Sequence, residues 1–372
     1  MASSAPTSPA GGLDPAAFVR PELAARPEYR LDLSPCRFKL DQNESPYELP
    51  RAIKRRVADE LAAAPWAPYP TFHADRLRAA LSAAHDWPAA GILVGNGSNE
   101  LLAMTLAATT RAGAVVVGAD PTFGLYRTMI VAAGGEPSFL PPREDLRLPV
   151  AALLDEAEEH PNRAQILCSP NNPTGDAIPP DGVAALARRL RAPLFLDNAY
   201  GEFCRHDYRP LLGEHRNLVL FRTFSKAWAL GGLRVGYLLA DPSLVAELLK
   251  VKLPYNLSRG SEAAALAALE AGDRVARHVE LVVRRRAQWA EMLAGHGLEV
   301  FPSEANFLLA RVPGGAEAGR ALFAALAARS IRVRDVGGYP GLAGCLRVSV
   351  GDGAALRAVD QALAEIGEDG HA

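Results

Sequence analysis

Two different patterns of apolar and polar residues follow one another along the chain. Between about residues 51 and 255, short apolar runs alternate with segments in which Ala and Leu recur at helical spacing. Uninterrupted apolar runs are typical of strands buried on both faces, and helices between them are typical of crossover connections. The pattern therefore predicts an α/β unit with a mostly parallel sheet. The expected strands cover residues 91–95, 114–118, 165–168, 193–197, 218–222 and 234–239, and the expected helices include residues 99–108, 125–133 and 182–190.

The pattern changes beyond about residue 255. A long helical pattern over residues 259–294 is followed by short apolar runs and two further helical segments, which predicts a smaller α+β domain hinged on the long helix. We expect strands at residues 298–301, 306–310, 331–334 and 345–350, and helices at residues 317–328 and 354–366.

The beginning of the chain has no clear period. Residues 1–30 are rich in Ala, Pro, Ser and Gly, and we expect a mobile tail that becomes ordered near its end. The resulting division is a tail at 1–30, a large domain at 51–255, and a small domain formed by 31–50 together with 256–372.

Composition and charge narrow the class of protein. The 372 residues are 49% hydrophobic and 22% charged, which is ordinary for a globular protein, and the formal net charge is −2. A balance near zero gives no long-range attraction to nucleic acid or to an anionic membrane. Two basic clusters, at 54–56 and 284–286, lie on helical patterns with acids nearby, so solvated helix faces are favoured over a nucleic-acid patch.

The sequence also bears on location and metals. The first residues lack the basic and apolar regions of a signal peptide, and no run of about 18 apolar residues occurs. The four cysteines are far apart and form no C-x-x-C pair, so neither a zinc cluster nor a disulfide framework is expected. We expect a soluble, cytoplasmic protein with reduced thiols and no metal site.

The first motif with chemical potential is GNGSNE at residues 95–100, between an expected strand and an expected helix. Glycines permit a tight turn there, and the free N–H groups at a helix start attract an anion such as phosphate. Glu100 stands where a dinucleotide-binding motif has its last glycine, which weakens that interpretation. An acid in the first turn also suits an ordinary helix start, so the motif alone leaves both interpretations open.

Two further motifs follow apolar runs directly. SPNNPTG at 169–175 could be a simple turn, but in open α/β sheets ligands bind at the carboxyl ends of strands. Asp197 ends the next run, and Tyr200 lies three residues beyond it. A carboxylate and a phenol at such a position are a plausible site pair, and a helix N-cap is the equally weighted alternative.

The fourth motif contains a lysine at the end of an expected buried strand. Lysine is rarely buried without a partner, and desolvation or a nearby cation makes its amine a nucleophile toward carbonyl groups. Lys226 follows Thr223 and Ser225, and Arg234 comes shortly after; hydroxyls and a guanidinium are suitable donors to a phosphate. Since all four motifs follow strands of one expected sheet, we expect them to converge on one pocket.

The segments SPNNPTG, DNAY, SKAWALGGLR and CLRVSVG resemble those of fold-type-I, pyridoxal-phosphate-dependent aminotransferases of class I and II. Within that group they most resemble histidinol-phosphate aminotransferases, over about residues 40–366. The resemblance implies an α/β fold with a large domain, in which helices flank a mostly parallel seven-stranded sheet, and a smaller α+β domain.

The resemblance assigns roles around a pyridoxal 5′-phosphate cofactor. Lys226 would link covalently to the cofactor and move a proton between substrate and cofactor carbons. Asp197 would pair with the pyridine nitrogen and keep it protonated. Asn172 and Tyr200 would hydrogen-bond the 3-oxygen of the ring. Phe123, at a position where relatives often have tyrosine, would stack on the ring.

The resemblance also implies a phosphate site and a homodimer. Tyr69 matches a tyrosine that relatives contribute to the phosphate site of the partner subunit, so the active sites would be shared between two copies. The residues that would hold the phosphate within one chain are Gly97, Ser98, Thr223, Ser225 and Arg234.

Substrate recognition rests on fewer residues. Arg347 matches an arginine that grips an anionic substrate group, and Arg334 matches a second arginine characteristic of the histidinol-phosphate group. Two arginines suit a doubly charged phosphate better than a carboxylate, although Arg334 could instead form a surface ion pair with Asp335. Tyr47, in the segment NESPY, would cover the substrate.

The implied reaction is transamination between L-histidinol phosphate and 2-oxoglutarate, which gives imidazole-acetol phosphate and glutamate. Ser45, Asn198 and Phe123 depart from the family pattern, and Ser45 and Phe123 leave room for another substrate preference. The alternatives are an aromatic amino acid aminotransferase, a decarboxylase of a phosphorylated amino acid, a non-catalytic binding module of the same fold, and a nicotinamide-dependent dehydrogenase suggested by GNGSNE alone.

Overall fold

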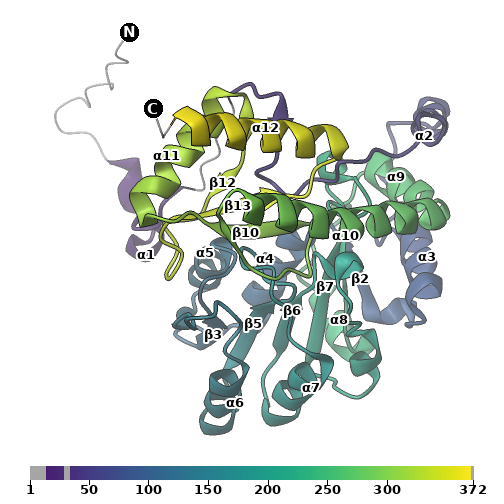
Figure 1. Ribbon diagram of the computed structural model, residues 1–372. Helices are drawn as coiled ribbons and strands as arrows, with labels where there is room; N and C mark the ends of the chain where they lie inside the picture. Colours follow the sequence, from purple (N-terminus) through teal and green to yellow (C-terminus); the bar gives the residue numbers. More distant parts are fainter. Residues whose placement is uncertain (1–13, 29–33, 370–372) are drawn as a thin grey trace.

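The computed structural model describes residues 14–28 and 34–369 of the chain and contains a large central sheet (Figure 1). The strand order is β2-β8-β7-β6-β5-β3-β4; β8 runs antiparallel to both of its neighbours, and all other pairs are parallel. The predicted α/β class and mostly parallel sheet are therefore confirmed. The strands are β2 (Ile92–Gly95), β3 (Val115–Ala119), β4 (Glu136–Leu140), β5 (Ala164–Cys168), β6 (Leu194–Asp197), β7 (Leu218–Thr223) and β8 (Gly236–Leu239).

The six predicted apolar runs all form strands of this sheet, and the seventh strand, β4, was not predicted. Its sequence, EPSFL, includes Glu136 and Pro137, and none of its residues is fully buried. It lies at the sheet edge beside β3, where a proline costs no hydrogen bond to a further strand. Central strands such as β6 and β7 are buried along their whole length, as uninterrupted apolar runs require.

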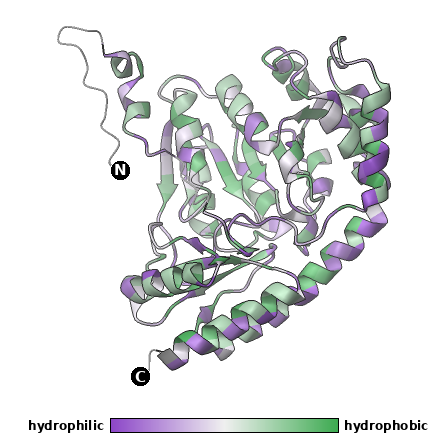
Figure 2. Cartoon of the chain, turned by 90° about the horizontal axis from the view of Figure 1, so that it is seen from above, coloured by the Kyte–Doolittle hydropathy of each residue, from purple (hydrophilic) through white to green (hydrophobic). Residues whose placement is uncertain are grey.

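Helices follow most strands of the large sheet and pack around it. α4 contacts α5, and α6 contacts α7, whereas α8 packs near the start of β2. In Figure 2 the strands at the centre are mostly green, and the helices at the periphery carry both colours, as expected for amphipathic surface helices. The helices are α4 (Ser98–Thr109), α5 (Leu125–Ala132), α6 (Val150–Glu159), α7 (Pro180–Arg189) and α8 (Pro242–Leu248).

A second, antiparallel sheet of four strands lies above the large sheet in Figure 1. Its order is β12-β13-β10-β9; α10 (Gly272–Gly295) and α11 pack against its strands, and α12 packs against these two helices. β1 (Phe38–Lys39) pairs in parallel with β11 (Ile331–Arg332), so the early chain joins the late chain here. The other elements are β9 (Glu299–Val300), β10 (Phe307–Arg311), β12 (Arg334–Asp335), β13 (Cys345–Ser349), α11 (Gly315–Ala328) and α12 (Gly353–Asp369).

The prediction of one helix over residues 259–294 is wrong. The backbone leaves the helical region at Ala271, which separates α9 (Arg259–Glu270) from α10 (Gly272–Gly295). α9 packs against α2 (Arg51–Ala63) and α3 (Asp75–His85), whereas α10 extends to the small sheet. A helical period alone cannot reveal such a break, because both halves keep their amphipathic pattern.

The expected strand at residues 331–334 is also divided. Residues 331 and 332 form β11 beside β1, and residues 334 and 335 form β12 beside β13. Val333 lies between them and is buried. The chain therefore changes sheets within one apolar run.

Part of the expected N-terminal tail packs on the large sheet's helices. Within residues 14–28 the chain forms a turn and the short helix α1 (Pro21–Ala24). The Arg20 guanidinium donates to the backbone oxygens of Val131 (3.2 Å) and Ala132 (2.8 Å) at the end of α5. The rest of the tail expected over residues 1–30, namely residues 1–13, 29 and 30, lies outside the described residues. Within the described residues, no helix combines the length and apolarity needed to cross a membrane.

Gly236 sets how closely α4 approaches the large sheet. An added Cβ there would lie 2.3 Å from the Ser98 nitrogen and 2.4 Å from the Gly97 carbonyl carbon, both of which are backbone atoms. Backbone atoms cannot rotate away as a flexible side chain can, so only glycine permits the start of α4 to rest against β8.

We therefore expect Gly236→Ala to lower the free energy of unfolding by about 1–3 kcal/mol, the usual cost of an overpacked site. Urea denaturation followed by circular dichroism measures this change. Gly213→Ala is the matched control, because a Cβ at Gly213 meets nothing within 4 Å. Equal stability of the two variants would contradict the close approach.

Candidate active site

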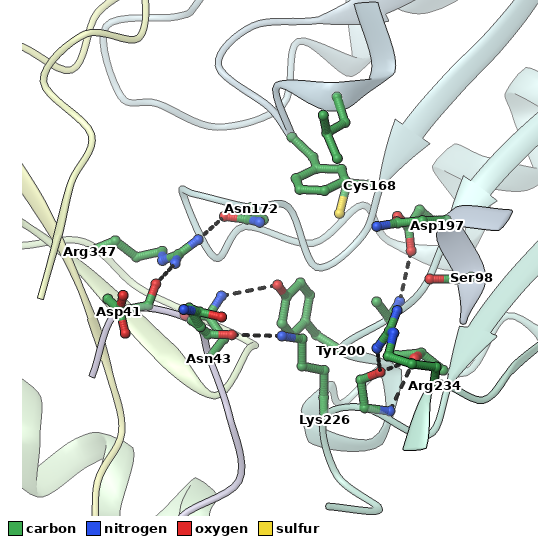
Figure 3. Close-up of a pocket in the computed structure, with 17 residues that line it drawn as sticks. Asp41, Asn43, Ser98, Cys168, Asn172, Asp197, Tyr200, Lys226, Arg234 and Arg347 are labelled. Carbon is green, nitrogen blue, oxygen red and sulfur yellow. Dashed lines mark hydrogen bonds between the residues drawn. The ribbon is translucent and has the colours of Figure 1, made fainter. Parts of the chain in front are cut away.

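One pocket collects the chemical groups at the carboxyl ends of the large sheet's strands (Figure 3). Asn172 comes from the loop after β5, Asp197 ends β6, and Lys226 follows β7, whereas Arg347 reaches in from β13 of the small sheet. The structure thus brings together ten residues singled out in the sequence: Ser98, Phe123, Asn172, Asp197, Tyr200, Thr223, Ser225, Lys226, Arg234 and Arg347.

Asp197 forms the buried acidic end of the pocket. Its side chain is almost fully buried, and burial raises the pKa of its carboxyl above the ordinary value. Hydrogen bonds from the Tyr126 hydroxyl to Oδ2 (2.7 Å) and from the Ala199 N–H to Oδ1 (3.1 Å) act in the opposite direction, as does the charge of Lys226. The carboxylate is therefore held in one orientation by a donor on each oxygen.

Lys226 projects into the pocket from the loop after β7. Its Nζ donates to the backbone oxygen of Gln42 at 2.7 Å and lies 5.9 Å from the centre of the Tyr200 ring. Burial, and secondly the positive charge of Arg347, lower its pKa to about 7. Near neutral pH a large share of this amine is therefore unprotonated, which is the nucleophilic form.

A cradle for an anion lies beside the start of α4. Arg234 Nη1 donates to Ser225 Oγ (3.0 Å) and to the Gly231 backbone oxygen (3.0 Å), and Thr223 Oγ1 donates to Ser225 Oγ (3.0 Å). Ser98 opens α4, so free N–H groups and the positive end of the helix dipole face the same space. Hydroxyls, a guanidinium and a helix start together suit a phosphate group.

Two backbone conformations build this cradle. Gly97 has a φ of +85°, and a Cβ there would lie 2.5 Å from Arg234 Nη2, so the guanidinium packs directly over the glycine. Arg234 itself adopts the left-handed region, with a φ of 53°. A non-glycine residue in that region is strained, and such strain is concentrated at functional sites. Gly97 therefore belongs to the cradle although its atoms do not line the pocket.

The opposite side of the pocket is formed by a hydrogen-bonded group around Tyr200. Figure 3 shows Arg347 and Asn43 on one side of Tyr200, and Asp197 and Arg234 on the other. Arg347 Nη1 donates to Asn172 Oδ1 at 2.6 Å, and its Nη2 donates to the backbone oxygen of Asp41. Asn43 Nδ2 donates to the Tyr200 hydroxyl at 3.0 Å.

Besides Gly97, three residues singled out in the sequence do not line the pocket. Tyr69 is 77% exposed and stacks on Tyr255 with 4.6 Å between ring centres. Tyr47 stacks on His278 (4.7 Å) and accepts a hydrogen bond from Arg285 (2.6 Å), so it does not face the pocket in this chain.

The third residue outside the pocket is Arg334. It lies on β12 directly opposite Arg347 on β13, in antiparallel register. Side chains opposite one another on antiparallel strands share a face of the sheet. Arg334 is therefore on the pocket side of the small sheet, next to the arginine that enters the pocket.

The sequence analysis missed two buried groups of the site. Tyr126 lies in the first turn of α5, three residues after Phe123, which precedes the helix, and this short separation is the signal that could have placed both side chains near one another. Asn43 stands in the segment NESPY, of which only Tyr47 was singled out. Its positive φ of 55° turns its side chain toward Tyr200, a conformation that sequence alone does not indicate.

Glu100, the acid in GNGSNE, has a structural role and connects two segments of the chain through hydrogen bonds. It accepts hydrogen bonds from Asn96 Nδ2 (2.7 Å) and Asn256 Nδ2 (2.6 Å), which join the start of α4 to the segment before α9. In the basic clusters, Arg56 pairs with Glu270 and Arg284 with Glu280. These pairings agree with helix faces balanced by acids.

Comparisons with known proteins give a consistent family. Residues 37–364 match the family model described as "Aminotransferase class I and II". The chain is 37% identical over 315 residues to the histidinol-phosphate aminotransferase of Chlorobium phaeovibrioides, covering 84% of this chain and 86% of that protein. It is 37% identical over 337 residues to that of Chromobacterium violaceum, covering 90% and 93%.

The structural comparison agrees with these matches. The crystal structure of histidinol-phosphate aminotransferase from Sinorhizobium meliloti in complex with pyridoxal-5′-phosphate superposes with a TM-score of 0.82 at 27% identity, covering 89% of this chain and 91% of that one. L-threonine-O-3-phosphate decarboxylase from Porphyromonas gingivalis shares the fold, with a TM-score of 0.76 at 23% identity and coverage of 89% and 99%.

The lowered pKa of Lys226 predicts selective reactivity. With a pKa of about 7, half of its amine is neutral at pH 7, against roughly one molecule in three thousand for an ordinary lysine. Because only the neutral amine reacts, we expect acetylation of Lys226 by trace acetic anhydride to rise with a midpoint near pH 7. Peptide mass spectrometry of protein freed of bound small molecules measures the profile, with exposed Lys250 as the internal control. A midpoint above pH 9 would contradict the desolvated environment.

Proposed function

The chain belongs to the class I and II aminotransferase family, and we propose that it transfers the amino group of L-histidinol phosphate to 2-oxoglutarate with pyridoxal 5′-phosphate as cofactor. The products are imidazole-acetol phosphate and glutamate, and the reaction is a step in histidine biosynthesis. The single observation that carries the substrate assignment is the pair of arginines, Arg334 and Arg347, that face one another across β12 and β13.

The residues of the pocket fit pyridoxal 5′-phosphate. The cofactor has a basic ring nitrogen, a ring oxygen, an aldehyde and a phosphate, and the pocket offers a matching group for each. A buried carboxylate, Asp197, lies at one end, and the anion cradle of Arg234 and the α4 start lies beside it. Lys226, with its lowered pKa, and Tyr200 line the space between.

We propose the following contacts to the cofactor. Asp197 binds the ring nitrogen, Asn172 and Tyr200 bind the ring oxygen, and Phe123 stacks on the ring. When bound, the cofactor supplies an electron sink for the substrate carbon that loses a proton. The residues that hold its phosphate are Gly97, Ser98, Thr223, Ser225 and Arg234.

Lys226 performs the proton chemistry in this proposal. Lys226 would hold the cofactor through its neutral Nζ, and the same amine, once free, would accept the proton that the substrate carbon gives up and return it. The ordinary lysine pKa would leave the amine protonated at neutral pH, whereas a pKa of about 7 keeps both states accessible. Tyr200, whose pKa burial raises, stays protonated and donates.

The arginine pair accounts for the substrate class. Arg334 and Arg347 stand directly opposite one another on neighbouring strands, so their guanidinium groups can reach the same anion. A phosphate monoester carries up to two negative charges and accepts bidentate hydrogen bonds, which suits a pair of guanidinium groups. Histidinol phosphate has no carboxylate, so Arg347 takes its phosphate, and in the second half-reaction it takes a carboxylate of 2-oxoglutarate.

We also propose that two copies of the chain share their active sites. Tyr69, Phe72 and Tyr255 contact one another through their rings and form an exposed apolar cluster, and Trp66 (79% exposed) and Leu253 (71% exposed) are close to them in sequence. None of the five lines the chain's own pocket. Exposed apolar patches of this kind mark interfaces. A second copy covers this surface, and Tyr69 reaches the phosphate cradle of the partner subunit.

The proposal also covers the division of the chain into two domains and the cellular compartment of the protein. We assign residues 51–255 to the large domain and residues 31–50 with 256–372 to the small one, with the pocket between the two sheets. The four cysteines are free thiols in the described chain, which supports a reducing, cytoplasmic location.

The purified chain is expected to convert histidinol phosphate with 2-oxoglutarate, and Arg334→Gln is expected to raise KM for histidinol phosphate about ten- to a hundredfold, the value of a charged hydrogen bond. The glutamate half-reaction should change by less than about threefold. Single-turnover spectroscopy of each half-reaction provides the measurement. Arg311→Gln, which removes a pair with Glu299 on the same sheet, is the control.

Three results would contradict the substrate assignment. Brisk transamination of phenylalanine without turnover of histidinol phosphate would indicate an aromatic amino acid aminotransferase. Release of carbon dioxide from phosphothreonine would indicate a decarboxylase. Equal losses in both half-reactions of Arg334→Gln would show that Arg334 has no selective role.

Shared sites predict complementation between two inactive variants. Tyr69→Ala removes the residue that would contribute to the active site of the partner subunit. Lys226→Ala removes the residue that acts in the active site of its own subunit. In a hybrid dimer one site has both residues intact, so we expect about half of the wild-type activity. Purification through two different affinity tags isolates the hybrid. Activity no higher than that of the parent variants would exclude a shared site.

A further inference from the structure

The carboxylate of Asp197 has a side-chain donor that the sequence analysis did not identify. The hydroxyl of Tyr126 donates to Asp197 Oδ2 at 2.7 Å, and the other donor, the Ala199 N–H, is part of the backbone. Tyr126 is fully buried, so its hydroxyl has no access to bulk water. In the described part of the chain, Tyr126 is thus the side chain that donates a hydrogen bond to the Asp197 carboxylate.

Tyr126 is held in place by contacts with Phe123, which lies just before α5. Its N–H donates to the Phe123 backbone oxygen at 3.1 Å, and the two rings meet edge to face with centres 5.4 Å apart. Phe123 lines the pocket, whereas Tyr126 lies behind it. The loop before α5 therefore supplies a ring to the pocket, and the first turn of α5 supplies a donor to its buried acid.

The neighbouring thiol does not compete for this role. Cys168 lies beside Asp197 in the register of β5 and β6, and its Sγ–H donates to the Pro170 oxygen at 3.1 Å. Burial raises the pKa of the Cys168 thiol, so it keeps its proton. Burial and the Asp197 charge also raise the pKa of Tyr126, which therefore stays a donor at working pH.

Burial creates a specific problem for Asp197. Its surroundings favour the neutral carboxylic acid, and a neutral acid would not hold a protonated ring nitrogen. Donors to the carboxylate favour its charged form, and a donor on each oxygen also fixes the plane of the group.

We propose that Tyr126 is a positioning residue whose hydroxyl keeps Asp197 ionised and aimed at the ring nitrogen of the cofactor. The proposal rests on the proposed function, because it requires pyridoxal 5′-phosphate in this pocket. It predicts that the Tyr126 hydroxyl contributes to cofactor affinity through the ring nitrogen and through no other part of the cofactor.

The test measures dissociation constants with cofactor-free protein and two probes. One probe is pyridoxal 5′-phosphate, and the other is the analogue in which a C–H group replaces the ring nitrogen. The variants are Tyr126→Phe and Tyr126→Leu, which share only the loss of the hydroxyl. Tyr237→Phe is the matched control, because Tyr237 on β8 is also fully buried and its hydroxyl forms a hydrogen bond with His85 (2.8 Å) and not with Asp197. Thermal unfolding confirms that each variant is folded.

We expect both Tyr126 variants to bind pyridoxal 5′-phosphate about ten- to a hundredfold more weakly than the wild type. Their ratio of affinities for the two probes should fall by the same factor, because this ratio cancels packing losses common to both probes. In an Asp197→Asn background, Tyr126→Phe should change the affinity for pyridoxal 5′-phosphate by less than about threefold, as expected for two residues acting as one unit. Tyr237→Phe should leave the ratio unchanged.

Other outcomes overturn the proposal. Equal losses for both probes, no loss for pyridoxal 5′-phosphate, or an undiminished loss in the Asp197→Asn background would each show that Tyr126 does not act through the ring nitrogen. If the wild-type chain itself fails to bind pyridoxal 5′-phosphate, the proposed function fails. If the wild type binds and transaminates while Tyr126→Phe is unaffected, only this inference fails.

Discussion

Burial of opposite charges at the ends of two adjacent strands is the constraint on which the site depends. Asp197 ends β6 and is almost fully buried, and Lys226 follows β7 and is partly buried in the same pocket. A charged group in such a place loses hydration and must recover the loss through hydrogen bonds or give up its charge. Asp197 is compensated by hydrogen bonds from Tyr126 and the Ala199 N–H. Lys226 loses its charge more readily than an ordinary lysine, with a pKa of about 7.

The surrounding fold holds these groups through close backbone contacts. The start of α4 rests on Gly236, and the Arg234 guanidinium packs over Gly97, so the anion cradle is built from rigid elements. Glu100 joins the α4 start to Asn256, next to Tyr255, which stacks on the exposed Tyr69. One chain of contacts therefore runs from the phosphate cradle to the surface proposed as the dimer interface.

The sequence predicts this architecture well where one local rule decides the outcome. Uninterrupted apolar runs predicted β2, β3 and β5 to β8, because strands buried on both faces need no polar alternation. The edge strand β4 was not predicted because Glu136 and Pro137, at its start, leave no uninterrupted apolar run. The break at Ala271 was missed because it depends on the separate packing of α9 and α10.

The site shows the same contrast. Residues at strand ends, such as Asn172 and Lys226, are foreseeable because the carboxyl ends of parallel strands meet at one edge. Tyr126 and Asn43 reach the site through a helix turn and a left-handed backbone, which depend on the tertiary fold. Tyr47 stacks on His278 of α10 and not over the pocket, because the path of the chain after residue 43 is set by packing on that helix.

The central claim is that these groups form one cofactor site whose reactive amine is Lys226. Borohydride reduction of the protein saturated with pyridoxal 5′-phosphate, followed by peptide mass spectrometry, tests it most directly. The account predicts one reduced cofactor per chain, attached to the peptide that contains Lys226. Attachment to another lysine, or no stable attachment at all, would contradict it.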